Sequence, residues 1–172
     1  EFLPLSSKNW IKCANALKED WNKIIYDDQS EILDNSTSTE KEIYVCGNPP
    51  YLGSTWQSKT HKEDLNEVFK DHTKLSKSLD YVSGWFMKAA QFCQNNLSSA
   101  AFVSTNSICQ GQHVPILWPL IYKFGCNINF AYSSFKWKNL ASHNAGVIVI
   151  IVGITTEKNN KKFLYNVMEN EE

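Results

Sequence analysis

The sequence predicts an α/β domain with a largely parallel sheet. Short, almost continuously apolar segments alternate with segments whose apolar residues recur at helical spacing. Strands that are apolar on both sides are typical of parallel sheets covered by helices. With 172 residues, 42% of them hydrophobic, the chain is long enough for one domain with a substantial core.

The predicted elements follow one another along the chain. A short apolar run covers residues 10–14, and residues 26–41 are polar and indicate a surface loop. We expect strands at 43–46, 100–105, 128–132 and 147–153, and helices at 62–69, 78–94 and 114–124, the last beginning near Pro115. The last two strands enclose the loop 133–146 without a helix, which predicts an antiparallel hairpin at the sheet edge.

Composition and charge narrow the function classes. The net charge is −1, and all seventeen basic residues are lysines. Arginine makes most bidentate contacts to guanine, so its absence argues against base reading by this segment. Five widely spaced cysteines without a CxxC pair favour reduced thiols over a zinc site or a disulfide framework. The longest apolar run, 145–154, is too short to span a bilayer and no signal peptide is evident, so we expect a cytoplasmic protein.

The segment Val45-Cys46-Gly47-Asn48-Pro49-Pro50-Tyr51 carries the chemical information. Ligands of open α/β sheets bind at the carboxyl ends of strands. Two prolines after a strand make a rigid loop, which places Asn48 and Tyr51 at that end. The alternative is that the string merely ends a strand and that Tyr51 packs in the core.

Context favours the functional interpretation. The string resembles the Asn-Pro-Pro-Tyr signature of amino-group DNA methyltransferases. Further segments match one subgroup in order: Asn15-Ala16-Leu17-Lys18-Glu19-Asp20-Trp21, Leu79-Asp80-Tyr81-Val82-Ser83-Gly84-Trp85, Phe102-Val103-Ser104-Thr105-Asn106-Ser107-Ile108 and Ser134-Phe135-Lys136-Trp137. From about residue 3 to 154 the chain resembles the MmeI-like restriction–modification polypeptides, which fuse nuclease, adenine-N6 methyltransferase and target-recognition domains.

The resemblance implies a partial Rossmann-like fold and a role for each motif residue. The side-chain oxygen of Asn48 and the carbonyl of Pro49 would accept the two hydrogens of an adenine amine. Pro50 would stiffen the loop, and Tyr51 would stack on a base flipped out of double-stranded DNA, since the amine is out of reach inside the duplex. The methyl donor would be S-adenosylmethionine.

Other residues receive roles from the same resemblance. Phe135 matches the second stacking aromatic, in the loop between the last two strands, and Trp137 is the alternative. Lys136 and Lys138 would contact phosphates; packing of the rings and solvation of the lysines is the competing interpretation. Asn15, with Ala16 beside it, would meet the adenine of the methyl donor, where the family usually has aspartate.

Some polar residues receive no role. Asp80 and the four histidines, His61, His72, His113 and His143, form no recognisable constellation. For the histidines we expect surface or loop positions. Asn106 follows a strand on the same side of the sheet as Asn48, but the sequence assigns it no function.

The family's glycine-rich cofactor loop is absent, because all seven glycines lie at or after Gly47. We therefore expect residues 1–154 to be the C-terminal part of a methyltransferase domain without its first strands, and residues 155–172 to lead to a target-recognition domain. Any nuclease domain would precede Glu1. These 172 residues alone should bind S-adenosylmethionine weakly, be inactive, and expose the edge of the strand at 43–46, which invites self-association.

Two rival functions remain. One is amino methylation of cytosine N4, RNA or a protein glutamine, since related tetrapeptides serve these substrates. The other is a non-catalytic nucleic-acid-binding subunit with a degenerate methyltransferase fold.

Overall fold

The computed structural model describes residues 11–27, 42–136, 147–158 and 161–166. Its elements are α1 (Trp21–Asp27), β1 (Ile43–Gly47), α2 (Lys59–Phe69), η1 (Lys70–His72), α3 (Thr73–Ser76), α4 (Ser83–Asn95), β2 (Ser98–Thr105), η2 (Asn106–Cys109), α5 (His113–Lys123), β3 (Asn127–Lys136), β4 (Ile148–Thr155) and β5 (Phe163–Tyr165). This confirms an α/β architecture. No helix in the described part of the chain is long and apolar enough to cross a membrane.

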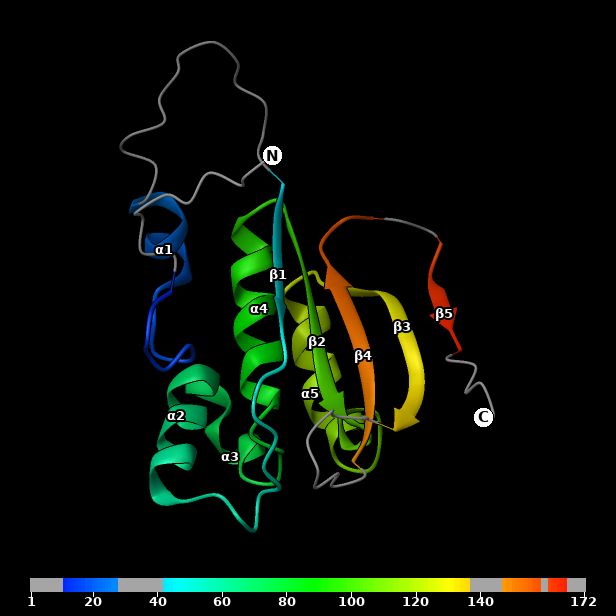
Figure 1. Cartoon of the computed structure of the whole chain (residues 1–172). Coiled ribbons are helices and arrows are strands. Elements are labelled where there is room, and N and C mark those ends of the chain that lie inside the picture. The colour runs from blue at the N-terminus through cyan, green and yellow to red at the C-terminus, as the bar shows by residue number, and fades with distance from the viewer. Residues whose placement is uncertain (1–10, 28–41, 137–146, 159–160, 167–172) are drawn as a thin grey trace, which may run out of the picture.

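The strands form one sheet in the order β1-β2-β4-β3-β5. The pairs β1–β2 and β3–β5 are parallel, whereas β4 is antiparallel to both β2 and β3. Four strands therefore run in one direction, and β1, β2 and β3 have their carboxyl ends at the same edge of the sheet (Figure 1).

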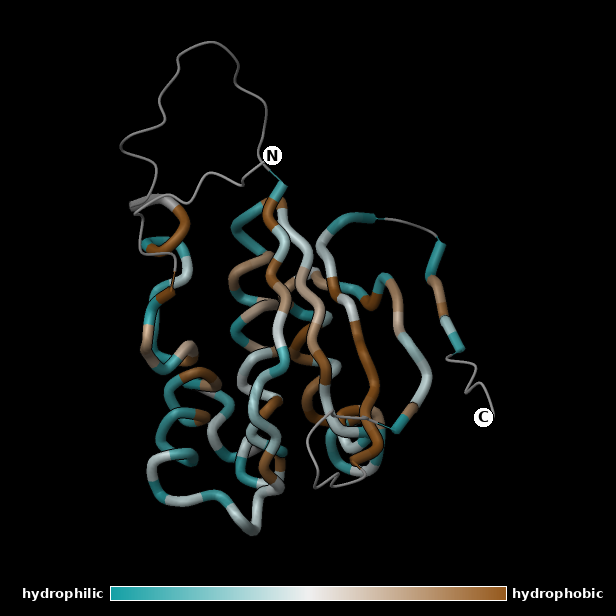
Figure 2. Tube along the Cα trace, in the orientation of Figure 1, coloured by the Kyte–Doolittle hydropathy of each residue, from teal (hydrophilic) through white to brown (hydrophobic). Residues whose placement is uncertain are grey.

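The antiparallel hairpin exists, but its predicted position at the sheet edge is wrong. β4 inserts between β2 and β3, and β5 pairs with the other side of β3. The uninterrupted aliphatic run Val-Ile-Val-Ile-Ile-Val at 147–152 suits this position. A strand with a neighbouring strand on each edge lies inside the sheet, where apolar side chains are favoured. Figure 2 shows β4 as a largely hydrophobic strand.

Helices α4 and α5 pack side by side on one face of the sheet, while α1 and α2 lie beyond the β1 edge (Figure 1). The core lies between the sheet and these helices and includes Phe86, Phe102, Leu117, Ile121 and Ile154, each almost fully buried. Phe86 meets Phe102 edge to face, with ring centroids 5.2 Å apart. This packing fixes the sheet end where β1 and β2 stop.

Several predicted boundaries shift for identifiable reasons. The helix predicted at 62–69 begins at Lys59, because Ser58 and His61 form a capping box in which histidine replaces the usual glutamate. Residues 78–82 form turns rather than the start of α4. There the Asp80 carboxylate accepts the N–H of Val82, a local bond that competes with helix formation.

The N-terminal apolar run behaves differently from a strand. Residues 11–14 have no strand geometry, and Ile11 is 85% exposed. A strand needs a partner for its backbone groups, and among the described residues none pairs with this segment. At the sheet edge, β1 likewise pairs with β2 only, within the part of the chain that is described.

Candidate active site

The Asn-Pro-Pro loop leaves the sheet at the carboxyl end of β1. β1 ends at Gly47, after which Asn48 is exposed, Pro49 is buried and Pro50 is exposed again. The buried ring of Pro49 fixes the loop to the domain, and the flanking Asn48 stays accessible. The sequence prediction of a rigid loop at a strand end is confirmed in its position.

Beside this loop lies a cavity of about 630 Å³. Its walls come from the turn after residue 13 and from the end of β1 with its loop. Aromatic and polar side chains of α1, α2, β2, α4 and the turn before α4 complete the lining. The lining residues are Ala14, Asn15, Ala16, Trp21, Val45, Cys46, Gly47, Asn48, Pro49, Pro50, His61, Tyr81, Trp85 and Phe102. Its volume lies within the range of roughly 300–1,000 Å³ typical of small-molecule sites.

The cavity brings together Asn48 and the Asn15-Ala16 pair, which lie far apart in the sequence. The turn that carries Asn15 is closed by its own side chain, because Oδ1 of Asn15 accepts the N–H of Leu17 at 3.0 Å. The indole N–H of Trp21 donates to the carbonyl of Ala16 at 2.9 Å. These bonds hold the predicted cofactor-binding segment as one wall of the same cavity.

The turn is anchored from behind by α4. The side chain of Leu17 is 3% exposed and packs against Gly84. Lys88 donates to the carbonyls of Leu17 at 2.6 Å and Glu19 at 2.5 Å, and its ammonium lies 5.6 Å from the ring centroid of Trp21. Burial lowers the pKa of Lys88, and the carboxylates of Glu67, Asp20 and Glu19 partly offset that effect.

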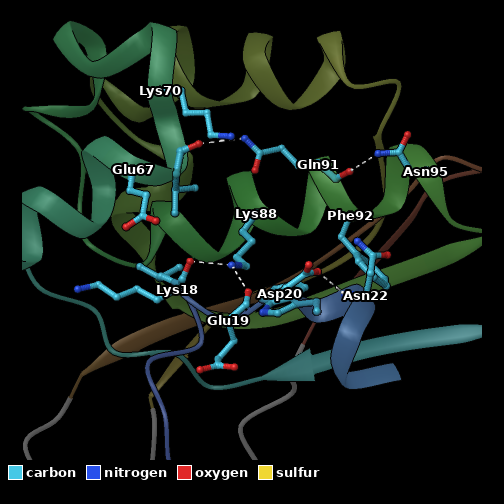
Figure 3. A pocket seen from close by; sticks show the side chains of 13 residues that line it. Lys18, Glu19, Asp20, Asn22, Glu67, Lys70, Lys88, Gln91, Phe92 and Asn95 are labelled. Atoms are coloured by element: carbon cyan, nitrogen blue, oxygen red, sulfur yellow. Dashed lines mark hydrogen bonds between the residues drawn. The ribbon is translucent and has the colours of Figure 1, made fainter. Parts of the chain in front are cut away.

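Figure 3 shows this arrangement in a second cavity of about 410 Å³ between α1, α2 and α4. Lys88 is directed at the turn backbone from the middle of α4, with Glu67 and Gln91 on either side. Because Lys88 is bound to two carbonyls of the turn, we interpret it as part of the framework of the first cavity.

A buried polar cluster fixes the chain that follows Tyr51. The carboxylate of Asp80 accepts the N–H of Leu52 at 2.8 Å, and Gln57 Nε2 donates to the carbonyl of Leu52 at 2.9 Å. The N–H of Asp80 donates to Nε2 of His113 at 2.8 Å. Burial lowers the pKa of His113, so the neutral ring that accepts this bond is favoured. No role for Asp80 or His113 was predicted from the sequence, because their partners come from three different segments.

Of the three aromatic residues predicted to stack on the target base, the structure describes Tyr51 and Phe135. Tyr51 is half-buried and packs against the core beside the cavity loop. Phe135 belongs to β3, opposite Val149 of β4, so the predicted loop position is wrong. The strand extends further than expected because its pairing with β4 continues to Lys136, which is exposed. Trp137, Lys138 and His143 lie outside the described residues.

Asn106 connects the ends of two strands. Its Oδ1 accepts the hydroxyl of Ser134 at 2.8 Å, which ties the start of η2 to β3 one residue before Phe135. Asn106 is absent from the cavity lining. Its position is that of a support for the β3 end and not of a cavity residue.

Two further features were not evident from the sequence. His61 lines the cavity and also caps α2, in place of the expected surface position. Trp56 is 80% exposed on the loop after Tyr51, whose fold is fixed by the buried Gln57. In the part of the chain that the structure describes, no cluster of His, Cys, Asp and Glu has the geometry of a metal site, and all five cysteines are free thiols.

Comparison with known proteins shows the family to which the chain belongs. A family model of the DNA-methyltransferase domain of MmeI matches residues 1–166. The chain is 48% identical over 151 residues to "DNA methyltransferase A" of Bacillus subtilis (strain 168), covering 88% of this chain and 16% of that protein.

A solved structure of the type IIL restriction–modification enzyme MmeI in complex with DNA superimposes with a TM-score of 0.81 and 38% identity. The match covers 96% of this chain and 20% of that one. The chain thus spans no more than about one fifth of the length of these relatives. It belongs to the MmeI-type DNA-methyltransferase domain family.

Proposed function

We propose that this domain transfers a methyl group from S-adenosylmethionine to N6 of an adenine flipped out of double-stranded DNA, as part of a restriction–modification protein. The observation that carries the proposal is the shared cavity of Asn48 and the Asn15-Ala16 turn. One wall offers polar groups for the donor nucleoside, and the other offers the motif for the acceptor amine. The relatives named above are a DNA methyltransferase and a DNA-bound restriction–modification enzyme.

The cavity fits the methyl donor chemically. Apolar surfaces from Val45, Phe102 and Trp85 suit an adenine ring, and the amides of Asn15 and Asn48 supply orienting polar groups. When bound, S-adenosylmethionine supplies a methyl group already activated on a sulfonium. We propose a Rossmann-like arrangement, because β1 and β2 are parallel and their carboxyl ends carry the site.

The chain's own contribution would be positioning. An exocyclic amine is a weak nucleophile because its lone pair is delocalised into the ring. The side-chain oxygen of Asn48 and the carbonyl of Pro49 would accept its two hydrogens and direct the lone pair toward the methyl group. Positioning of reacting groups contributes up to about 7–11 kcal/mol to a reaction of this kind.

The flipped base needs a surface on which to stack. Extrusion costs a few kcal/mol, and stacking on an aromatic ring returns about 1–3 kcal/mol per base. We propose Tyr51 for one face of the base. Phe135 is the candidate for the other face, because β3 ends at the same sheet edge as β1 and the Asn106–Ser134 bond supports that end. Trp137 remains the alternative, and Lys136 and Lys138 are proposed phosphate contacts.

We propose that residues 1–154 belong to the catalytic domain together with β5, which pairs with β3, and that the chain after β5 leads to a target-recognition domain. We also propose that the 172 residues alone bind S-adenosylmethionine weakly, since they contain no glycine-rich loop for it. Micromolar affinity of the isolated chain for S-adenosylmethionine in calorimetry would contradict this weak binding.

The decisive experiment uses the complete natural polypeptide that contains this chain. It is incubated with tritiated S-adenosylmethionine and mixed-sequence DNA, and the DNA is digested to nucleosides. We expect label in N6-methyladenosine, lost in Asn48→Ala and retained in Asn127→Ala, which removes an exposed amide at the start of β3. Label in N4-methylcytosine would shift the reaction to the sister class. No label from a folded protein would favour a non-catalytic nucleic-acid-binding subunit.

A further inference from the structure

Asp64 is a buried carboxylate next to the cavity wall. It lies in the middle of α2 and is 2% exposed. Its Oδ2 accepts the hydroxyl of Tyr81 at 2.7 Å and the side-chain N–H of Asn15 at 2.9 Å, and Lys18 Nζ lies 3.0 Å from Oδ1. Three segments that are separate in the sequence thus meet at one carboxylate.

The carboxylate is held in its charged form. Burial works to raise the pKa of Asp64, but the hydrogen bonds from Tyr81, Lys18 and Asn15 outweigh it and the pKa lies below the ordinary value. Burial and the bond to Asp64 raise the pKa of Tyr81, so its hydroxyl stays protonated and donates. An ionised carboxylate accepts hydrogen bonds and donates none.

This charge state determines which way the amide of Asn15 points. Only the NH2 group of Asn15 is a suitable partner for an ionised carboxylate, so Oδ1 must be on the other side, where it accepts the N–H of Leu17 at 3.0 Å. An amide oxygen has two lone pairs, so one acceptor position remains. Asn15 is exposed and lines the cavity, where a ligand can use that position.

The same contact explains why residue 15 is asparagine. An aspartate there would place two carboxylates at hydrogen-bond distance, and like charges that close oppose simultaneous ionisation. Asparagine supplies the donor that Asp64 needs and still presents an oxygen to the cavity. In this pair the negative charge is on Asp64, while Asn15 presents the acceptor oxygen to the cavity.

We propose that Asp64 is a positioning residue that fixes the Asn15 amide with its oxygen available to the ligand, and so selects a nucleoside with an exocyclic amine over one with a carbonyl at the same position. This selection rests on the proposed function, in which the donor nucleoside binds along the Asn15 wall. Asp64 itself need not touch the ligand.

The test compares two probes on the complete polypeptide by titration calorimetry. One is S-adenosylhomocysteine, and the other is its inosine analogue, in which a carbonyl oxygen replaces the amine. The wild type should prefer the adenosine compound by about ten-fold or more, since the analogue sets two acceptors against each other in a confined site. In Asp64→Asn the amide of residue 64 can donate as well as accept, so only the N–H of Leu17 still orients the Asn15 amide, and the preference should fall to about two-fold or less on the same scale.

Three further variants separate selection from folding. Glu63→Gln makes the same kind of change one residue earlier, on the exposed side of α2, and should keep the preference. Asn15→Ala removes an exposed amide and should abolish the preference even with Asp64 intact. The exchange Asn15→Asp with Asp64→Asn swaps carboxylate and amide, keeps the net charge, and should restore the preference.

Retention of the ten-fold preference in Asp64→Asn or in Asn15→Ala would overturn the proposal. If Asp64→Asn does not fold, the exchange and Asn15→Ala still decide. A wild type that binds both probes equally would overturn the selection while leaving methyl transfer intact. A wild type that binds neither probe and labels no DNA would instead contradict the proposed function.

Discussion

Oδ1 of Asp80 accepts the backbone N–H of Leu52 at 2.8 Å, and this bond ties the residue after Tyr51 to the turn before α4. The same oxygen accepts the N–H of Val82 at 3.1 Å, and the N–H of Tyr81 donates to the carbonyl of Leu52 at 3.0 Å. The hydroxyl of Tyr81 also donates to Asp64, which accepts the side-chain N–H of Asn15. The loop of the motif and the Asn15 wall are therefore both fixed to the start of α4.

Asp80→Ala should impair turnover more than cofactor binding. The change leaves the half-buried N–H of Leu52 and the buried N–H of Val82 without their acceptor, so the chain beside Tyr51 loses its fixed position. We expect kcat for DNA methylation to fall by about ten-fold or more, because small displacements at a positioning site are costly. The affinity for S-adenosylhomocysteine should change little, since the Asn15 wall is held by other bonds.

The conservative variant provides the control. Asp80→Asn keeps an oxygen acceptor and should retain most of the activity. A loss of affinity equal to the loss of kcat in Asp80→Ala would show that Asp80 supports the whole cavity and not the Tyr51 loop in particular.

Gly84→Ala should destabilise the domain. A Cβ at this position would lie 3.0 Å from Leu17 Cδ1 and 3.0 Å from Leu65 Cδ2, closer than normal packing allows. Overpacking of a core costs about 1–3 kcal/mol, and the better helix propensity of alanine offsets up to about 1 kcal/mol of that. Urea unfolding should therefore show a lower free energy of unfolding.

Gln94→Ala, at an exposed position of the same helix, is the matched control and should change the free energy of unfolding by no more than about 0.5 kcal/mol. A Gly84→Ala protein as stable as the wild type would mean that the side chain of Leu17 moves aside freely and is not closely packed against α4.

The pH dependence of stability should show a contribution from His113. Burial lowers its pKa in the folded protein, so the folded state disfavours the proton that the unfolded chain binds with a pKa near 6.5. The stabilisation is therefore fully present above about pH 6.5 and is lost as the pH falls through that value toward the folded pKa. Protonation of Nε2 also removes the acceptor for the N–H of Asp80.

Thermal unfolding between about pH 5 and pH 8 measures this effect. In His113→Gln, which keeps an acceptor but does not titrate, the melting temperature should depend less on pH. An unchanged slope in that variant would assign the dependence to other groups.

Gly153→Ala should be strongly destabilising because of one ring. A Cβ on Gly153 would lie 2.2 Å from Cε1 of Phe130, which is paired with Gly153 across β3 and β4. Phe130→Ala removes the ring, so the double variant should lose less stability than the two single changes added together. Residues in contact couple by about 0.5–3 kcal/mol. Strict additivity in chemical unfolding would show that the ring does not oppose the new methyl group.

The sequence by itself determined which segments form helices and strands, and where the Asn-Pro-Pro motif lies among them. Apolar periodicity predicted four strands and three helices that the structure contains, and four of these elements, β1, β2, β4 and α5, lie within two residues of the predicted bounds. Burial on one side of a helix or on both sides of a strand leaves a local pattern of this kind. The Asn-Pro-Pro string marked the end of β1 by a different local effect, since two consecutive prolines stop a strand. These features depend on neighbours within a few residues.

Only the tertiary structure decided which polar residues matter around that motif. In the sequence, Glu63 and Asp64 are adjacent acids in one charged helix, yet Glu63 is exposed and Asp64 is buried against Asn15 and Tyr81. Two other features are likewise long-range: β4 inserts between β2 and β3, and the Asp80 carboxylate accepts the N–H of Leu52. A hydrogen bond between distant segments leaves no periodic trace in either of them, because its partners are brought together by the packing of the whole domain.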